Sequence, residues 1–188
     1  MNRSAAALLL FAVPTVAESV PIDVQRSSIT IHVGKSGLLS AAGHEHTINA
    51  PISSGMIEES PTPQVEFVVR TTAMTVQADP KVDPKTHAQI QKDMEEMTLE
   101  TSKFSEIRFK SSRIDQTPNG QWKVQGDLSL HGVTKPVSLV VSRTGEAYTA
   151  RTTLKQTDFG IKPISVAGGT IKVKNEVEIE FQILAPHR

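Results

Sequence analysis

The stretch Leu130-His131-Gly132-Val133-Thr134-Lys135-Pro136-Val137 lies between two segments in which apolar and polar residues alternate. Apolar residues share one parity before it, from Trp122 to Leu130, and again after it, from Val137 to Val141. Gly132 can adopt a positive φ without steric cost, as a tight turn requires, and Pro136 lacks an N–H donor and suits the start of a strand. The sequence therefore predicts two half-buried strands joined by a hairpin turn.

The same alternation recurs along the rest of the chain. It is clearest in the last run, where apolar residues from Ile171 to Ile183 share one parity and polar side chains take the other. Segments of this kind, separated by Gly, Pro, Asn or Ser, are at 28–33, 47–57, 65–73, 106–114, 121–131, 137–143, 148–157 and 169–184. About eight antiparallel strands favour a closed barrel, because closure removes exposed edge strands. The predicted fold class is all-β, an antiparallel eight-stranded β-barrel.

One segment breaks the alternation and predicts a single amphipathic helix at about 84–98. Asp83 is placed to cap its N-terminus, with Pro84 at the first helical position. The polar residues 91–93 and 95–96 are expected to face water. The residues expected on the buried face recur at spacings of three and four and are His87, Ile90, Met94 and Met97.

The first seventeen residues have the order of a secretory signal peptide, with Arg3, an apolar run at 5–13 and the small-x-small sequence Thr15-Val16-Ala17. The apolar run is too short to span a membrane. We expect cleavage after Ala17, so that 1–17 is the signal peptide and 18–188 is one domain in the periplasm. A buried N-terminal helix is the alternative, but no later segment offers it a helical partner.

The composition excludes several classes of protein. The chain has no cysteine, which excludes a cysteine nucleophile, thiolate metal ligands and acylation of an N-terminal cysteine. Basic and acidic residues number 20 each, and one Trp, one Tyr and six Phe are too few for nucleic-acid binding or stacked carbohydrate platforms. No Gly-x-Ser-x-Gly elbow is present, and the acidic pairs Glu58-Glu59 and Glu95-Glu96 are expected on solvated faces. We predict no catalytic residues and no enzyme.

The motifs, taken in order, resemble the YceI-like family of periplasmic lipid-binding proteins. The hairpin stretch extends to the sequence LSLHGVTKPVSLVV, and four further segments match, at 28–34, 104–112, 158–161 and 176–183. The resemblance covers essentially the whole mature chain. It implies an elongated, lipocalin-like antiparallel β-barrel whose interior takes the chain of a polyisoprenoid or a similar amphiphile. The segment 33–46 departs from the first hairpin that is usual in the family.

An eight-stranded barrel is either filled by its own side chains or holds one small ligand. Each buried CH₂ contributes roughly 0.8 kcal/mol, whereas association costs about 4 to 15 kcal/mol, so a useful ligand needs a chain on the order of 20 carbons. Ordinary core packing is the alternative role for every apolar position. The candidate lipid-binding residues are Ile29, Ile31, Phe67, Val69, Phe109, Leu128, Leu130, Phe159, Ile179 and Phe181. Lys35, Lys162 and Lys172 are candidates for a lipid head group or are simply solvated.

The segment His44-Glu45-His46 supports a metal-binding alternative, because histidines at i and i+2 on a strand point to the same side. A third ligand would have to come from His32, His87, His131 or a carboxylate, and the spacing does not show which. His131 is otherwise expected to hydrogen-bond backbone at the hairpin.

The predicted function is therefore a periplasmic binding or carrier protein for a polyisoprenoid, a prenyl quinone or a fatty acyl lipid. The alternatives are a metal-binding protein that uses His44 and His46, and a filled barrel that acts through its surface. We expect no cofactor apart from such a lipid, no nucleic acid and no membrane-spanning segment. The oligomeric state stays open, with a homodimer among the options.

Overall fold

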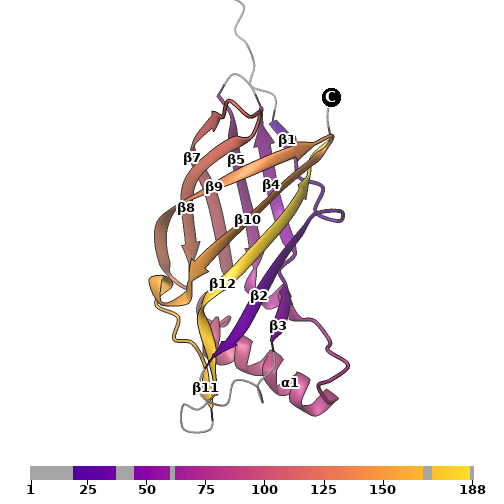
Figure 1. Ribbon diagram of the computed structural model, residues 1–188, viewed down its shortest axis with the longest axis vertical. Coiled ribbons are helices and arrows are strands. Elements are labelled where there is room, and N and C mark those ends of the chain that lie inside the picture. Colours follow the sequence, from indigo (N-terminus) through magenta and orange to yellow (C-terminus); the bar gives the residue numbers. More distant parts are fainter. Residues whose placement is uncertain (1–18, 37–44, 60–61, 167–170, 187–188) are drawn as a thin grey trace, which may run out of the picture.

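The computed structural model describes residues 19–36, 45–59, 62–166 and 171–186. Within them, one antiparallel sheet of twelve strands curls around a single interior (Figure 1). The strands are β1 (Ser19–Pro21), β2 (Ser28–Ser36), β3 (His46–Asn49), β4 (Ile52–Glu58), β5 (Gln64–Arg70), β6 (Thr75–Val76), β7 (Glu106–Gln116), β8 (Trp122–Leu130), β9 (Val133–Thr144), β10 (Ala147–Lys155), β11 (Ser165–Val166) and β12 (Ile171–Leu184). The helical segments are α1 (Pro84–Asp93), η2 (Thr71–Ala73), η3 (Met94–Thr98) and η4 (Gln156–Phe159).

The chain itself brings the two ends of the sheet together. The strand order is β1-β4-β5-β7-β8-β9-β10-β12-β2-β3-β6, so β3 and β4 lie near opposite ends. Only Ala50 and Pro51 separate these two strands, and the Ala50 N–H donates to the Ile29 carbonyl across 2.9 Å. The sheet must therefore curl back on itself. This confirms the predicted all-β, lipocalin-like class.

The strand count differs from the predicted eight for two reasons. The segment predicted at 47–57 is bent at Ala50-Pro51 into β3 and β4, and the short strands β1, β6 and β11 lack a run long enough to show alternation. The segment predicted at 65–73 ends as a strand at Arg70, where η2 begins. With β3 and β4 counted as one bent strand, the long strands correspond to the predicted segments.

The helical region spans 84–98, as predicted, through α1 and η3 together. The Asp83 carboxylate accepts hydrogen bonds from the N–H groups of Lys85 and Thr86, each at 3.1 Å, which confirms the N-terminal cap. The prediction for Met97 was wrong, because this side chain is 64% exposed. The last turn is a π-helix, and its extra residue rotates Leu99 into the core instead.

Gln91 also differs from its predicted place in water. Its side-chain oxygen accepts from the Val76 N–H at 2.7 Å, and its nitrogen donates to the Met74 carbonyl at 3.0 Å. His87 contacts the Val76 carbonyl through Nε2 at 3.0 Å. Two side chains one helical turn apart therefore bind the backbone at β6 and fix α1 against the sheet.

The predicted hairpin joins β8 and β9, but its turn is shorter than the predicted segments imply, with only His131 and Gly132 between the strands at φ of 51° and 75°. Pro136 does not begin the strand, however, because β9 starts at Val133 and pairs Pro136 with Asp127. Strand β9 pairs with β10 only from Ser142 to Thr144, so Pro136 lies where β9 is a sheet edge and a missing N–H is tolerated.

The His131 side chain was expected to hydrogen-bond the backbone of the hairpin, but it contacts side chains instead. Its Nε2 contacts the Glu100 carboxylate at 3.0 Å, and its ring lies 4.3 Å from that of Phe104. The turn is therefore fixed by side chains from the segment that follows the helix.

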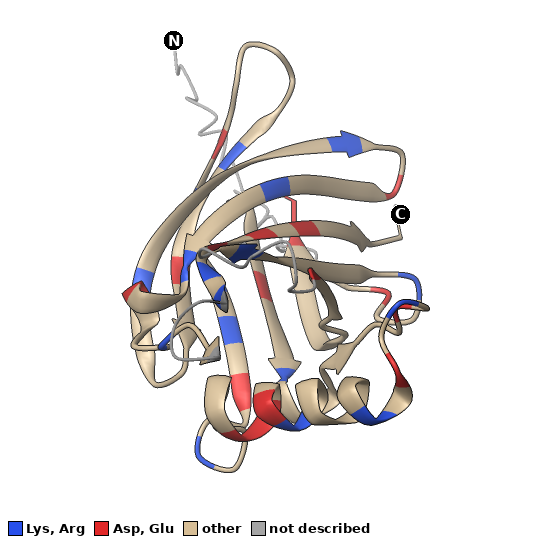
Figure 2. Cartoon of the chain, turned by 60° about the horizontal axis from the view of Figure 1, so that its bottom comes forward, with Lys and Arg blue, Asp and Glu red and all other residues tan. Residues whose placement is uncertain are grey.

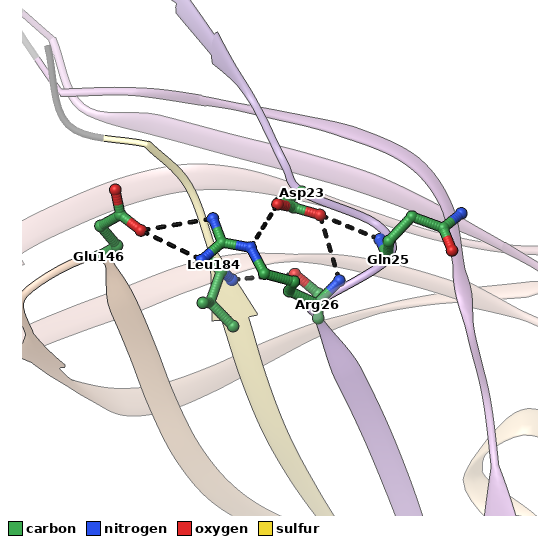
Figure 3. A network of polar contacts seen from close by, with 6 residues as sticks. Asp23, Gln25, Arg26, Glu146 and Leu184 are labelled. Carbon is green, nitrogen blue, oxygen red and sulfur yellow. Dashed lines mark hydrogen bonds and ion pairs between the residues drawn. The ribbon is translucent and has the colours of Figure 1, made fainter.

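The turn between β1 and β2 is bound to the end of β12 and to the turn between β9 and β10 (Figure 3). The Asp23 N–H donates to the Leu184 carbonyl at 2.8 Å, and the Asp23 carboxylate accepts from the Arg26 guanidinium at 2.6 Å. Arg26 also reaches Glu146 at 3.4 Å. The neighbouring guanidinium lowers the pKa of Asp23 below its ordinary value.

Candidate functional site

The curled sheet encloses an apolar cavity of about 560 Å³. Its wall comes from the inward parity of the long strands, and α1 covers one end. The structure thus contradicts the alternative hypothesis in which the side chains of the barrel fill its interior. All ten candidate lipid-binding residues line this cavity, namely Ile29, Ile31, Phe67, Val69, Phe109, Leu128, Leu130, Phe159, Ile179 and Phe181. Their contact with a lipid stays a prediction.

Strand β9 shows how the alternation builds the wall. Val137, Leu139 and Val141 line the cavity, whereas Val140 between them points outward and is 48% exposed. Elsewhere the rings of Phe67 and Phe109 lie side by side at 5.5 Å on β5 and β7. Neighbouring strands therefore present a continuous apolar surface to the interior.

We call the end covered by α1 the helix end. Its lining includes Thr86, Gln89, Ile90, Asp93 and Met94. Figure 2, in which this end comes forward, shows α1 lying across it with residues of both charges along the helix. The helix thus contributes apolar side chains toward the cavity and polar ones at the rim.

The structure divides the three lysines that the sequence suggested for a head group. Lys35 follows Ile29, Ile31 and Val33 on the inward parity of β2 and lines the cavity, as does Lys172, whereas Lys162 does not. Lys155 also lines the cavity and lies 3.8 Å from the Glu176 carboxylate. Sequence reasoning missed Lys155 because it ends β10 on the parity opposite to the apolar residues of that strand.

We call the opposite end the tyrosine end, lined by Trp122, Val141 and Tyr148. The Tyr148 hydroxyl donates to the Glu59 carboxylate at 2.5 Å, and Arg143 Nη1 lies 3.2 Å from the same carboxylate oxygen. The Arg143 guanidinium carbon is 5.0 Å from the centre of the Tyr148 ring, which faces Trp122 edge-on. Burial and then the Glu59 hydrogen bond raise the pKa of Tyr148, so this hydroxyl stays protonated.

Glu59 corrects the prediction that its acidic pair lies on a solvated face. Its side chain is only 33% exposed, because it bonds Tyr148 and Arg143. Glu96 of the other pair is solvated, as expected, and lies 4.0 Å from Lys92. The sequence contains one indication that Arg143 belongs with Glu59 and Tyr148, because Arg143 has the same inward parity as Val137, Leu139 and Val141.

The metal-binding alternative gains no support. His44 lies outside the described residues, and His46 lies in β3 and lines the cavity. The proposed third ligands are dispersed, with His32 near Glu180, His87 at Val76 and His131 at Glu100. In the part of the chain that the structure describes, no three His, Asp or Glu residues are grouped to hold a metal ion.

Comparison with known sequences agrees with this architecture. The profile of the YceI-like domain family matches residues 21–185. A UPF0312 protein of Shewanella oneidensis is 30% identical over 167 residues, which cover 81% of this chain and 82% of the relative. A UPF0312 protein of Vibrio cholerae is 32% identical over 125 residues, and the match covers 60% of this chain and 64% of that relative.

Solved structures share the fold at low sequence identity. A polyisoprenoid binding domain from Saccharophagus degradans, implicated in plant cell wall breakdown, superposes with a TM-score of 0.61 at 15% identity, covering 91% of this chain and all of the domain. BcnA of Burkholderia cenocepacia gives a TM-score of 0.58 at 14% identity, covering 88% and 99%. In the residues described here, no helix is long and apolar enough to cross a membrane.

Proposed function

The chain belongs to the YceI-like domain family, and we propose that it is a periplasmic binding or carrier protein for one long-chain amphiphile. The tail of a polyisoprenoid, a prenyl quinone or a fatty acyl lipid would lie in the cavity. The observation that carries the proposal is the cavity of about 560 Å³, whose wall is apolar on every long strand. The signal-peptide pattern of residues 1–17 supports export to the periplasm.

The size of the cavity suits a long tail. Pockets for small organic ligands measure about 300–1,000 Å³. With about 30 Å³ for a water-sized group, the cavity takes roughly twenty groups the size of a methylene. At roughly 0.8 kcal/mol for each buried methylene, a tail of this length outweighs the cost of association.

The polar residues favour one orientation of the ligand. Lys35, Lys155, Lys172 and Asp93 line the cavity near the helix end, where a polar head group would meet charged side chains. At the tyrosine end the charges of Glu59 and Arg143 already bind each other. The head would thus lie near the rim at α1 and the tail would point toward Trp122. The description of the Saccharophagus domain as polyisoprenoid binding supports the same class of tail.

Native mass spectrometry of the protein purified from its own periplasm tests the proposal, followed by titration with a prenyl quinone that has a four-isoprene tail. We expect a co-purifying lipid or uptake of one quinone per chain. Leu139→Trp puts an indole into the cavity and should abolish uptake, whereas Val140→Trp on the outward face should leave it unchanged. A protein that carries no lipid and takes up no quinone would remove the basis of the proposal.

A further inference from the structure

The inward face of the sheet changes from apolar to charged at the tyrosine end. On β9, Arg143 follows Val137, Leu139 and Val141 on the same parity, and on the far side of the sheet Glu59 follows Ile57 of β4. Figure 1 shows that β4, β9 and β10 meet at the end opposite α1. Arg143 and Glu59 are the last residues on the inward parity of these two segments. Their charged side chains contact each other because the sheet curls.

The cluster is held in place by partners on several sides. Tyr148 is 7% exposed and the Arg143 side chain 17% exposed, and both bind Glu59. Arg143 Nε donates to the Gly145 carbonyl at 3.0 Å. Arg143 Nη2 is buried and has no hydrogen-bond partner among the described residues. The guanidinium is therefore fixed between the wall of the cavity and the β9–β10 turn, largely away from water.

Trp122 and Tyr148 line the cavity at this end, and the Glu59–Arg143 ion pair lies behind Tyr148, outside the cavity lining. A longer tail would have to displace Tyr148 and separate Glu59 from the Arg143 guanidinium, which is largely shielded from water, and this costs far more than one further methylene contributes. Glu58 and Gln64, which pair across β4 and β5, also line this end and add polar groups to it. Tail length should stop increasing affinity at this point.

We propose that Glu59, Arg143 and Tyr148 form a polar stop that sets the longest tail the cavity accepts. The stop determines specificity by length, and it rests on the proposed function because Tyr148, which Glu59 and Arg143 hold in place, lines the same cavity. It predicts a limit in tail length that depends on the charges at this end.

Prenyl quinones with one head group and tails of increasing length test the stop. For the wild type, the affinity should rise by roughly tenfold or more with each isoprene unit that fits, and then stay level. Glu59→Leu/Arg143→Met replaces the pair with apolar side chains of similar volume and should extend the limit by about one unit. Arg151→Met/Glu180→Leu removes the same residue types from the outward face and should leave the limit unchanged.

Val141→Phe provides a second test that does not require the charge pair to be replaced. Val141 lines the cavity opposite Trp122 on the neighbouring strand, so a larger side chain should shorten the limit. A wild type that binds quinones with no limit would overturn the stop alone, as would an unchanged limit in the charge-free variant. If that variant does not fold, an unchanged limit in Val141→Phe overturns it.

Two further outcomes separate the stop from the proposed function. An equal loss of affinity at every tail length in the charge-free variant would place the head group at the tyrosine end and overturn the stop. A wild type that binds no quinone of any length would overturn the proposed function itself.

Discussion

The backbone N–H of Leu99 donates a hydrogen bond across 2.9 Å to the carbonyl oxygen of Met94, five residues earlier. An α-helix would place the acceptor four residues earlier, so this turn holds one extra residue. As a result Leu99 is 7% exposed and Met97 is 64% exposed. The core face of the helical region therefore ends on a residue that regular helical spacing does not select.

Leu99→Ala should lower the free energy of unfolding by about 2 to 5 kcal/mol, because it leaves a cavity in the core. Met97→Ala should change it by less than about 0.5 kcal/mol, since its side chain is in solvent. Urea unfolding of both variants measures the difference. Equal effects of the two substitutions would contradict the burial described for this turn.

Much of the fold could be predicted because its determinants are local. Alternation with period two fixes which face of β9 is inward, and Gly132 fixes the turn. The extra residue between Met94 and Leu99 is not local in this sense, because packing against the sheet selects Leu99 over Met97. The periodicity of the sequence therefore does not predict which of these two residues is buried.

The candidate site likewise has one part that could be predicted from the sequence and one part that could not. Every candidate lipid-binding residue lines the cavity, nine because inward parity in a curled sheet leads to one interior and Phe159 from η4. The contact of Glu59 with Arg143 depends on the chain bend at Pro51 and on the registers of several strands between them. Such a contact follows from closure of the sheet, which no single segment encodes.

Gly126 lies in the cavity wall at a position where the neighbouring atoms leave no room for a Cβ atom. A Cβ at this position would lie 2.7 Å from Cζ of Phe109 and 2.5 Å from the backbone carbonyl oxygen of Lys110. Gly126→Ala should therefore destabilise the protein by about 1 to 3 kcal/mol. Gly34→Ala is the matched control, because its new Cβ meets only the flexible side chain of Lys174. Thermal or urea unfolding should show a loss for the first and little change for the second; a neutral Gly126→Ala would contradict the packing.

The contacts of α1 with β6 predict a local effect. Gln91→Ala removes the acceptor of the Val76 N–H and a donor to the Met74 carbonyl. Hydrogen exchange at the Val76 amide should become roughly tenfold faster, in line with the loss of about one net hydrogen bond. Gln89→Ala, whose side chain bonds Asp93 within the helix and not the backbone at β6, should leave that rate unchanged. Unaltered exchange in Gln91→Ala would show that the helix is held by other contacts.

Glu100 predicts a dependence of stability on pH. The hydrogen bond from Lys103, followed by that from His131, lowers the pKa of Glu100 below its ordinary value. A carboxyl whose pKa is lower in the folded state stabilises the fold above its unfolded pKa, and this contribution is lost as the pH falls through the folded pKa. The wild type should therefore lose stability relative to Glu100→Gln as the pH falls below about 4.5.

Thermal unfolding of both proteins between about pH 3 and pH 6 measures this difference. Glu96→Gln serves as the control, because Glu96 is exposed and lies only near Lys92. A stability difference between wild type and Glu100→Gln that stays constant over this range would contradict the assignment.

The fluorescence of Trp122 tests the central claim most directly, because it is the only tryptophan in the sequence and lines the cavity at the tyrosine end. Titration with a prenyl quinone that has a four-isoprene tail should quench it in a saturable manner, with one quinone per chain. A quinone with the same ring and no tail should produce only weak, non-saturating quenching. Quenching that is equally weak and linear for both quinones would contradict a lipid-binding interior.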